Sequence, residues 1–243
     1  MFRSYLIKTA DRSSKTADSG NCQISFTTPI EQGTYQISSC ALPNTQYNLP
    51  NGYNYVYWSF NSAPSTILSA QIVAGEYTTS TIASALQTCL NSTGAGGFTV
   101  SFSSTTNCLT VANASSFALR FSNNPTYSCE RQLGWIVGQD TAYGTSLTAP
   151  NGVQLLCSLG YLIQIFEAST RIVNSDNTSG GSAYYPKIGT YGEVQIYNNH
   201  NSHDQYIKLL SNCSTISIRI TDSLNRLVAL NGADLEMLIT QVN

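Results

Sequence analysis

The residues best placed to bind a metal are His200, His203 and Asp204, which lie together in the run NNHNSHDQ. A zinc site needs further ligands held rigidly around the ion. This run is instead polar and rich in Asn, which is typical of an exposed loop between strands. We therefore expect a solvated loop here and no metal site.

Other chemical motifs are weaker still. Asp176, flanked by Asn174 and Asn177, lacks the spaced acidic ligands and the terminal Glu of a calcium loop. The sequence contains no GxSxG run that would expose a nucleophilic serine, and no cysteine has an activating sequence context. We expect no catalytic residue, no cofactor and no metal, and hence a protein that is not an enzyme.

Carbohydrate binding is the alternative that the sequence leaves open. The 13 acidic residues could include a catalytic carboxylate pair, and 15 Tyr with Trp58 and Trp135 could supply platforms on which sugar rings stack. We favour aromatic side chains that pack in a core or an interface. A carbohydrate-binding β-sandwich module that recognises a glycan or a receptor remains the second hypothesis.

The charge composition argues against two classes of partner. Charged residues make up only 10% of the chain and the net charge is −2, so there is no basic patch for direct nucleic-acid binding. No apolar run approaches the roughly 18 residues of a membrane span. Weak repulsion between copies favours self-association.

The cysteines and the start of the chain indicate a cytosolic site of synthesis. No CxxC pair occurs, and the opening run MFRSYLIKTADRSSK has no apolar signal-peptide core. We expect reduced thiols at all seven positions, which are Cys22, Cys40, Cys89, Cys108, Cys129, Cys157 and Cys213.

Alternation of apolar and polar residues dominates the chain and predicts β-strands. Ile24 and Phe26, then Tyr35 and Ile37, mark two early strands. Further strands follow to the C-terminus, including a long one over Leu155 to Ala168. With about ten short strands and no strand–helix alternation, the fold class is all-β. A single jelly-roll β-sandwich of antiparallel strands fits best.

One segment has helical spacing instead. Ile82, Ala85, Leu86, Cys89 and Leu90 form an apolar stripe after the candidate caps Thr78, Thr79 and Ser80, which predicts an inserted amphipathic helix. A shorter helical turn is expected at Ser128 to Leu133, and Asn231-Gly232 predicts a hairpin turn. We expect an N-terminal arm over residues 1–20 and one jelly-roll domain over residues 21–243.

Several runs in order resemble one family. They are FRSYLIKTADRSSKTADSGNCQISFTTPI, YQISSCALPNTQYNL, GEYTTSTIASALQTCLN with FTVSFSSTTNCLTV, RQLGW, and ISIRITDSLNRLVALNGADLEMLITQV. Together they resemble the single jelly-roll penton and related minor capsid proteins of virophages and large double-stranded DNA viruses. The loop from Val173 to Gly189 matches no part of that pattern.

The resemblance implies a structural virion protein at the fivefold vertex of an icosahedral capsid. It implies a homopentamer that contacts the major capsid protein and other minor capsid proteins, made in the host cytoplasm and located in the virion. Residues 1–20 would then serve as an arm that ties each subunit to its neighbours.

Overall fold

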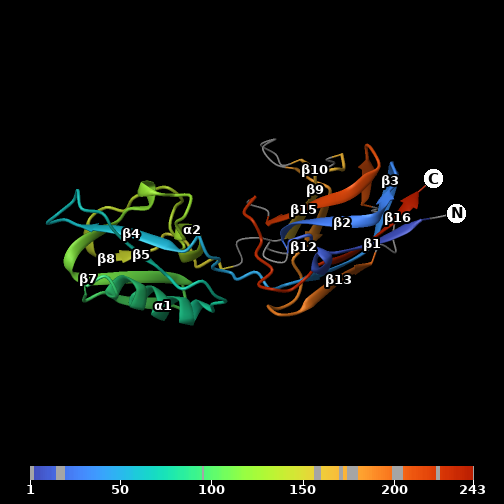
Figure 1. Ribbon diagram of the computed structural model, residues 1–243. Coiled ribbons are helices and arrows are strands. Elements are labelled where there is room, and N and C mark those ends of the chain that lie inside the picture. The colour runs from blue at the N-terminus through green and yellow to red at the C-terminus, as the bar shows by residue number, and fades with distance from the viewer. Residues whose placement is uncertain are drawn as a thin grey trace. The chain divides into compact units, whose positions relative to one another are not determined.

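The computed structural model describes residues 3–14, 20–94, 96–155, 160–169, 172–173, 180–198, 205–222 and 225–242 (Figure 1). The chain divides into two compact units. Unit 1 comprises Met1–Gln46 and Ser158–Asn243, and unit 2 is Tyr47–Cys157. This differs from the one domain expected over residues 21–243. The first boundary falls in the stretch over residues 42–54, whose Pro, Asn and Gly content predicts a loop but not a change of domain. The second falls inside the strand predicted over Leu155 to Ala168, so the sequence pattern does not show the division.

Unit 1 contains eight strand positions among its described residues. In chain order they are β1 (Ser4–Lys8), β2 (Asn21–Ile30), β3 (Gly33–Pro43), β9 (Gly160–Ile165), β12 (Ala183–Pro186), a sixth shared by β13 (Val194–Asn198) and β14 (Tyr206–Leu209), β15 (Cys213–Asp222) and β16 (Glu236–Val242). A short 3-10 helix η1 (Thr9–Asp11) follows β1, and a small hairpin joins β10 (Ile172–Val173) to β11 (Gly180–Gly181).

These strands pair as one long hairpin folded back on itself. The first position pairs with the eighth, the second with the seventh, the third with the sixth and the fourth with the fifth, all antiparallel. Pairing of β3 with β16 and of β9 with β15 then gives two sheets, ordered β1-β16-β3-β13 and β12-β9-β15-β2, with β14 also beside β3. This strand order is that of a jelly roll. The predicted fold class is confirmed.

The inner faces of both sheets build one core. Its fully buried members come from alternate positions of the strands, as a half-buried sheet requires. They include Ile7, Ile30, Tyr35, Tyr161, Ile163, Ile207, Ile218 and Met237.

The segment expected to be a free arm is part of this sheet. Strand β1 pairs with β16 from Ser4 opposite Thr240 to Lys8 opposite Glu236, and Ile7 is completely buried. The expectation of an arm is therefore wrong for residues 3–14, while residues 15–19 lie outside the described part. The alternation was hidden because Leu6, which points outward and is 48% exposed, is itself apolar.

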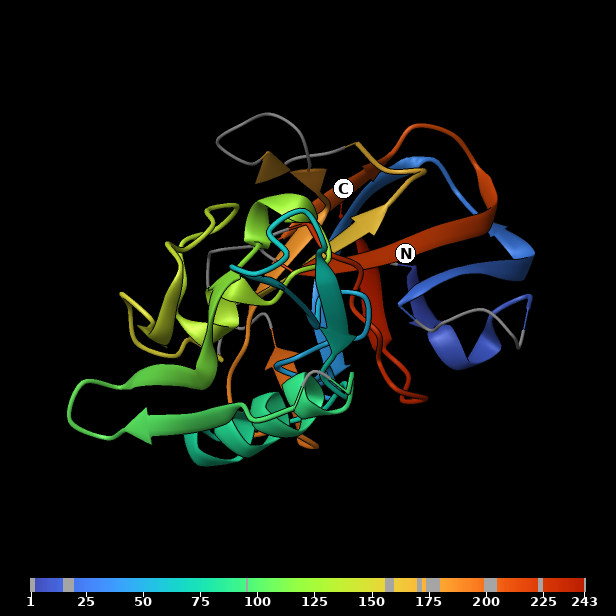
Figure 2. The same cartoon turned by 90° about the vertical axis from the view of Figure 1, so that its left-hand side faces the viewer.

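Unit 2 is an antiparallel sheet covered by a helix. Its elements are β4 (Tyr55–Phe60), β5 (Leu68–Gln71), α1 (Thr79–Asn91), β6 (Thr99–Ser103), β7 (Cys108–Leu119), η2 (Phe121–Asn123), α2 (Glu130–Leu133) and β8 (Gly144–Thr148). The sheet order is β5-β4-β7-β6, with β8 also paired to β7. Figure 2 shows α1 running along the sheet at one face.

Helix α1 confirms the predicted amphipathic helix. The Thr78 hydroxyl accepts from the Thr81 backbone N–H, and the Thr81 hydroxyl accepts in turn from the Thr78 N–H, which completes a capping box. The apolar stripe of the helix packs in the second core with Trp58 and Phe117. The helix thus covers the sheet of its own unit.

Buried asparagines order the chain where it passes from unit 1 to unit 2. In unit 1, Asn44 donates to the carbonyls of Gly189 and Thr190. In unit 2, Asn48 exchanges two hydrogen bonds with the backbone of Tyr77, and Asn54 donates to the carbonyl of Ile72. Because each side chain replaces a missing strand partner, this stretch forms the ordered loop that its Pro, Asn and Gly content predicts.

The pairing of β1 generates a prediction with a matched control. Ile7→Ala removes a fully buried side chain and should lower the free energy of unfolding by about 2–5 kcal/mol. Leu6→Ala, one residue away on the outer face, should change it by only about 0.5 kcal/mol. Urea unfolding of both variants measures the difference. Equal effects would show that Ser4–Lys8 is not a strand of the jelly roll.

Candidate functional site: an apolar outer edge of the jelly roll

The metal-like residues of the sequence are not placed by the structure. His200, His203, Asp204 and Asp176 all lie outside the described residues. Within the described part of the chain, no group of three or more His, Cys, Asp or Glu side chains could hold an ion. The expectation of a solvated loop at residues 200–204 stays a prediction.

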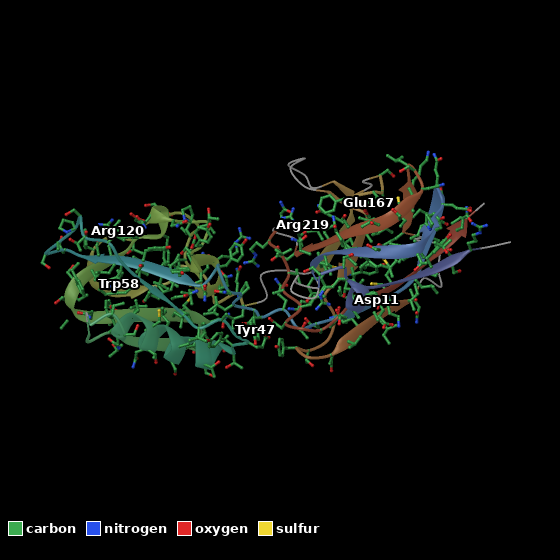
Figure 3. The ribbon with its side chains drawn as sticks, viewed as in Figure 1. Asp11, Tyr47, Trp58, Arg120, Glu167 and Arg219 are labelled. Carbon is green, nitrogen blue, oxygen red and sulfur yellow. The ribbon has the colours of Figure 1, made fainter. Side chains whose placement is uncertain are left out.

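The two tryptophans occupy different environments. Trp58 is completely buried in the core of unit 2, where its ring meets that of Phe98 edge to face at 5.9 Å (Figure 3). It offers no platform to a sugar. Trp135 packs against Phe121 and lines a surface pocket.

The described cysteines are free thiols, and Cys157 lies outside the described residues. Burial raises the pKa of Cys40 and of Cys89 to about 12. Both thiols therefore stay protonated at neutral pH, and neither is the thiolate that a nucleophile requires.

Strand β13 reverses the usual arrangement of a half-buried strand, because its apolar side chains face solvent and a polar side chain faces the core. Val194 and Ile196 point outward and are 59% and 68% exposed, whereas Gln195 between them is buried. The strand lies at the edge of its sheet, paired only with β3 within the described residues. An apolar, exposed edge strand is a surface that other chains bind readily.

Inward contacts hold β13 in this register. The Tyr197 hydroxyl donates to Gln195 Oε1 at 2.6 Å and lies beside the carbonyl of Pro186, and its ring packs 4.6 Å from that of Tyr185. Burial raises the pKa of Tyr197 to about 12, so its hydroxyl remains a donor at neutral pH. A slip of one residue would expose Tyr197 and bury Ile196, and these contacts oppose it.

The turn before β13 carries two further exposed apolar side chains. Ile188 and Tyr191 are 59% and 40% exposed and lie within nine residues of Ile196. The turn is fixed by the two bonds from Asn44 and by a bond from the Thr190 N–H to the Glu193 carboxylate. We call Ile188, Tyr191, Val194 and Ile196 the β13 patch.

A second exposed apolar pair lies at the other end of β3. Phe166 and Leu210 are each 62% exposed, and they flank the isolated bridge between Ala168 and Leu209. Leu209 pairs with Gly33 at one end of β3, and Val194 pairs with Pro43 at the other. At about 3.3 Å per residue, the β3 positions opposite Val194 and Leu209 lie about 33 Å apart along the strand. The described part of unit 1 thus presents exposed apolar groups near both ends of β3.

Solved structures similar to this chain include two from virophages. The crystal structure of the mavirus penton protein has 14% sequence identity, covers 98% of this chain and 97% of its own, and gives a TM-score of 0.44. A cryo-EM structure of the Sputnik virophage has 11% identity, covers 99% and 97%, and gives the same TM-score. The jelly roll itself is assigned from the strand order of unit 1.

Sequence comparison adds no relative, because no family model and no curated protein matches the chain. Among the described residues, no helix is both long and apolar enough to cross a membrane.

The reversed polarity of β13 predicts that its outward side chains do not stabilise the fold. Ile196→Thr should change the free energy of unfolding by about 0.5 kcal/mol or less. Ile207→Thr, on the buried side of β14, should cost about 2 kcal/mol or more because it buries a hydroxyl and leaves space in the core. The comparison is made by urea unfolding, at protein concentrations where the unfolding midpoint no longer depends on protein concentration. A large loss from Ile196→Thr would show that this side chain belongs to the core.

Proposed function

We propose that the chain is a structural virion protein of the fivefold capsid vertex, without catalytic activity. It assembles into a homopentamer that contacts the major capsid protein and other minor capsid proteins. It is made in the host cytoplasm and located in the virion. The single observation that carries the proposal is a jelly roll whose edge strand β13 turns its apolar residues outward.

Ring assembly explains why two different surfaces are present. A closed ring repeats one contact between unlike faces until it closes. The β13 patch supplies one face, and Phe166 with Leu210 supplies the other. Because these groups lie at opposite ends of β3, one copy can bind a neighbour through each of them.

The charge content and the ordered motifs of the sequence support the same role. Only 10% of the residues are charged, so copies repel one another weakly at high local concentration. The same scarcity of basic residues argues against direct contact with nucleic acid. The sequence runs that resemble penton proteins span both units.

The oligomeric state tests the proposal. Light scattering of the purified chain should give five times its mass of 26.3 kDa. The double variant Val194→Lys, Ile196→Lys places two charges in the contact and should weaken association at least about 100-fold. Val73→Lys in unit 2, at a valine that is 78% exposed outside the β13 patch, is the matched control and should leave assembly unchanged.

Mixing variants distinguishes a ring contact from a symmetric dimer. Phe166→Lys should also prevent assembly, because it damages the second face. The β13 double variant and Phe166→Lys should form heterodimers when mixed, since each retains the face that the other lacks. A monomeric wild-type chain, or a double variant that assembles normally, would contradict the proposal.

A further inference from the structure

Unit 2 contains a pocket that the assembly role does not use. It has a volume of about 310 Å³, at the lower end of the range for small-molecule sites. One wall is the segment after α2, and the other is formed by β8 and Pro150. Its lining includes Trp135, Gln139, Asp140, Ser146, Leu147 and Thr148.

Asp140 is a rigid acceptor with a compensated charge. One carboxylate oxygen accepts from the Ser122 backbone N–H at 2.9 Å, and the other from Arg120 Nη1 at 3.2 Å. Arg120, labelled in Figure 3, also donates from Nε to Ser59 and lies 4.8 Å over the ring of Tyr143. Each carboxylate oxygen keeps a lone pair for a ligand, because an ionised carboxylate can accept about four hydrogen bonds.

Neutral polar groups make up most of the remaining polar lining. Thr148 shares a hydrogen bond with the Thr110 hydroxyl across the strand pair. Gln139 and Ser146 are both exposed residues. The pocket therefore offers hydroxyl and amide groups beside one carboxylate whose charge Arg120 offsets.

Apolar groups complete the lining. Trp135 is 5% exposed and packs against Phe121, so its ring is fixed by packing where it lines the pocket. Leu147 is half-buried on β8, and Ile136 at the rim is 51% exposed. A ligand that fits must contact apolar carbon on some sides and pair with hydroxyl, amide and carboxylate groups on others.

We propose that this pocket binds a neutral sugar residue of a glycan. A sugar ring carries hydroxyl groups that can pair with Asp140, Gln139 and Ser146, and it has C–H faces that can contact Trp135 and Leu147. The described residues of the lining include no Lys or Arg that would pair with an anionic ligand. A wholly apolar ligand would leave the polar groups of the lining without partners. The inference does not depend on pentamer formation.

The purified chain, with both units, is tested on an array of neutral and acidic glycans, and the bound sugars are then titrated while tryptophan fluorescence is recorded. Saturable binding to a neutral sugar is expected, with a change in emission. Trp135→Phe should abolish that change, because the remaining Trp58 is buried in the core.

Variants of β8 place the binding in the pocket. Ser146→Tyr fills the pocket and should weaken binding at least about tenfold. Thr145→Tyr, at the adjacent exposed position outside the pocket lining, should bind as the wild type does. Gln139→Ala, which shortens an exposed side chain of the lining, should also weaken binding. Thermal unfolding checks that every variant is folded. Binding of acidic glycans alone, binding that Ser146→Tyr leaves unchanged, or no saturable binding would overturn the proposal.

Discussion

The nested antiparallel pairing of unit 1 is the constraint on which the rest of the structure depends. Strand β3 is central to it, since it pairs with β16 on one side and with β13 and β14 on the other. The whole of unit 2 is inserted between β3 and β9, the third and fourth strand positions. Such an insertion leaves the pairing intact because the entropy cost of a longer connection grows only slowly with its length. The jelly roll can therefore carry a second unit with its own core.

The same pairing determines which side chains reach the surface. Strand β3 fixes β13 at one end and β14 at the other, and thereby separates the β13 patch from Phe166 and Leu210. Within β13, the inward positions are taken by Gln195 and Tyr197, which leaves Val194 and Ile196 outside. Apolar side chains in this strand face solvent instead of the core, and such exceptions are expected where a protein binds a partner.

Much of the fold could be predicted from local patterns. The alternation at β2 and β3 and the helical stripe of α1 are visible because each element buries one face. The turn at Asn231-Gly232 is present, with a positive φ at both residues, but β16 pairs with β1 and β3, so no hairpin forms across it among the described residues. The turn before Gly134 is confirmed by helix α2. These features depend on residues close in sequence.

Features set by distant contacts could not be predicted. The strand predicted over Leu155 to Ala168 is the shorter β9 (Gly160–Ile165), because the chain turns at Phe166. Residues 156–159 lie outside the described part. The segment Leu227 to Leu230 forms only a bridge from Leu227 to Thr221. The β13 patch was missed because an apolar residue in an alternating run is normally assigned to the core. Only the register of β13 against β3 shows that Val194 and Ile196 point outward.

Single-particle electron microscopy of the purified assembly tests the central claim most directly. The account predicts closed rings with fivefold symmetry, in which unit 1 contacts its neighbours through the β13 patch on one side and through Phe166 and Leu210 on the other. A particle without fivefold symmetry, or a ring in which β13 faces solvent, would contradict it.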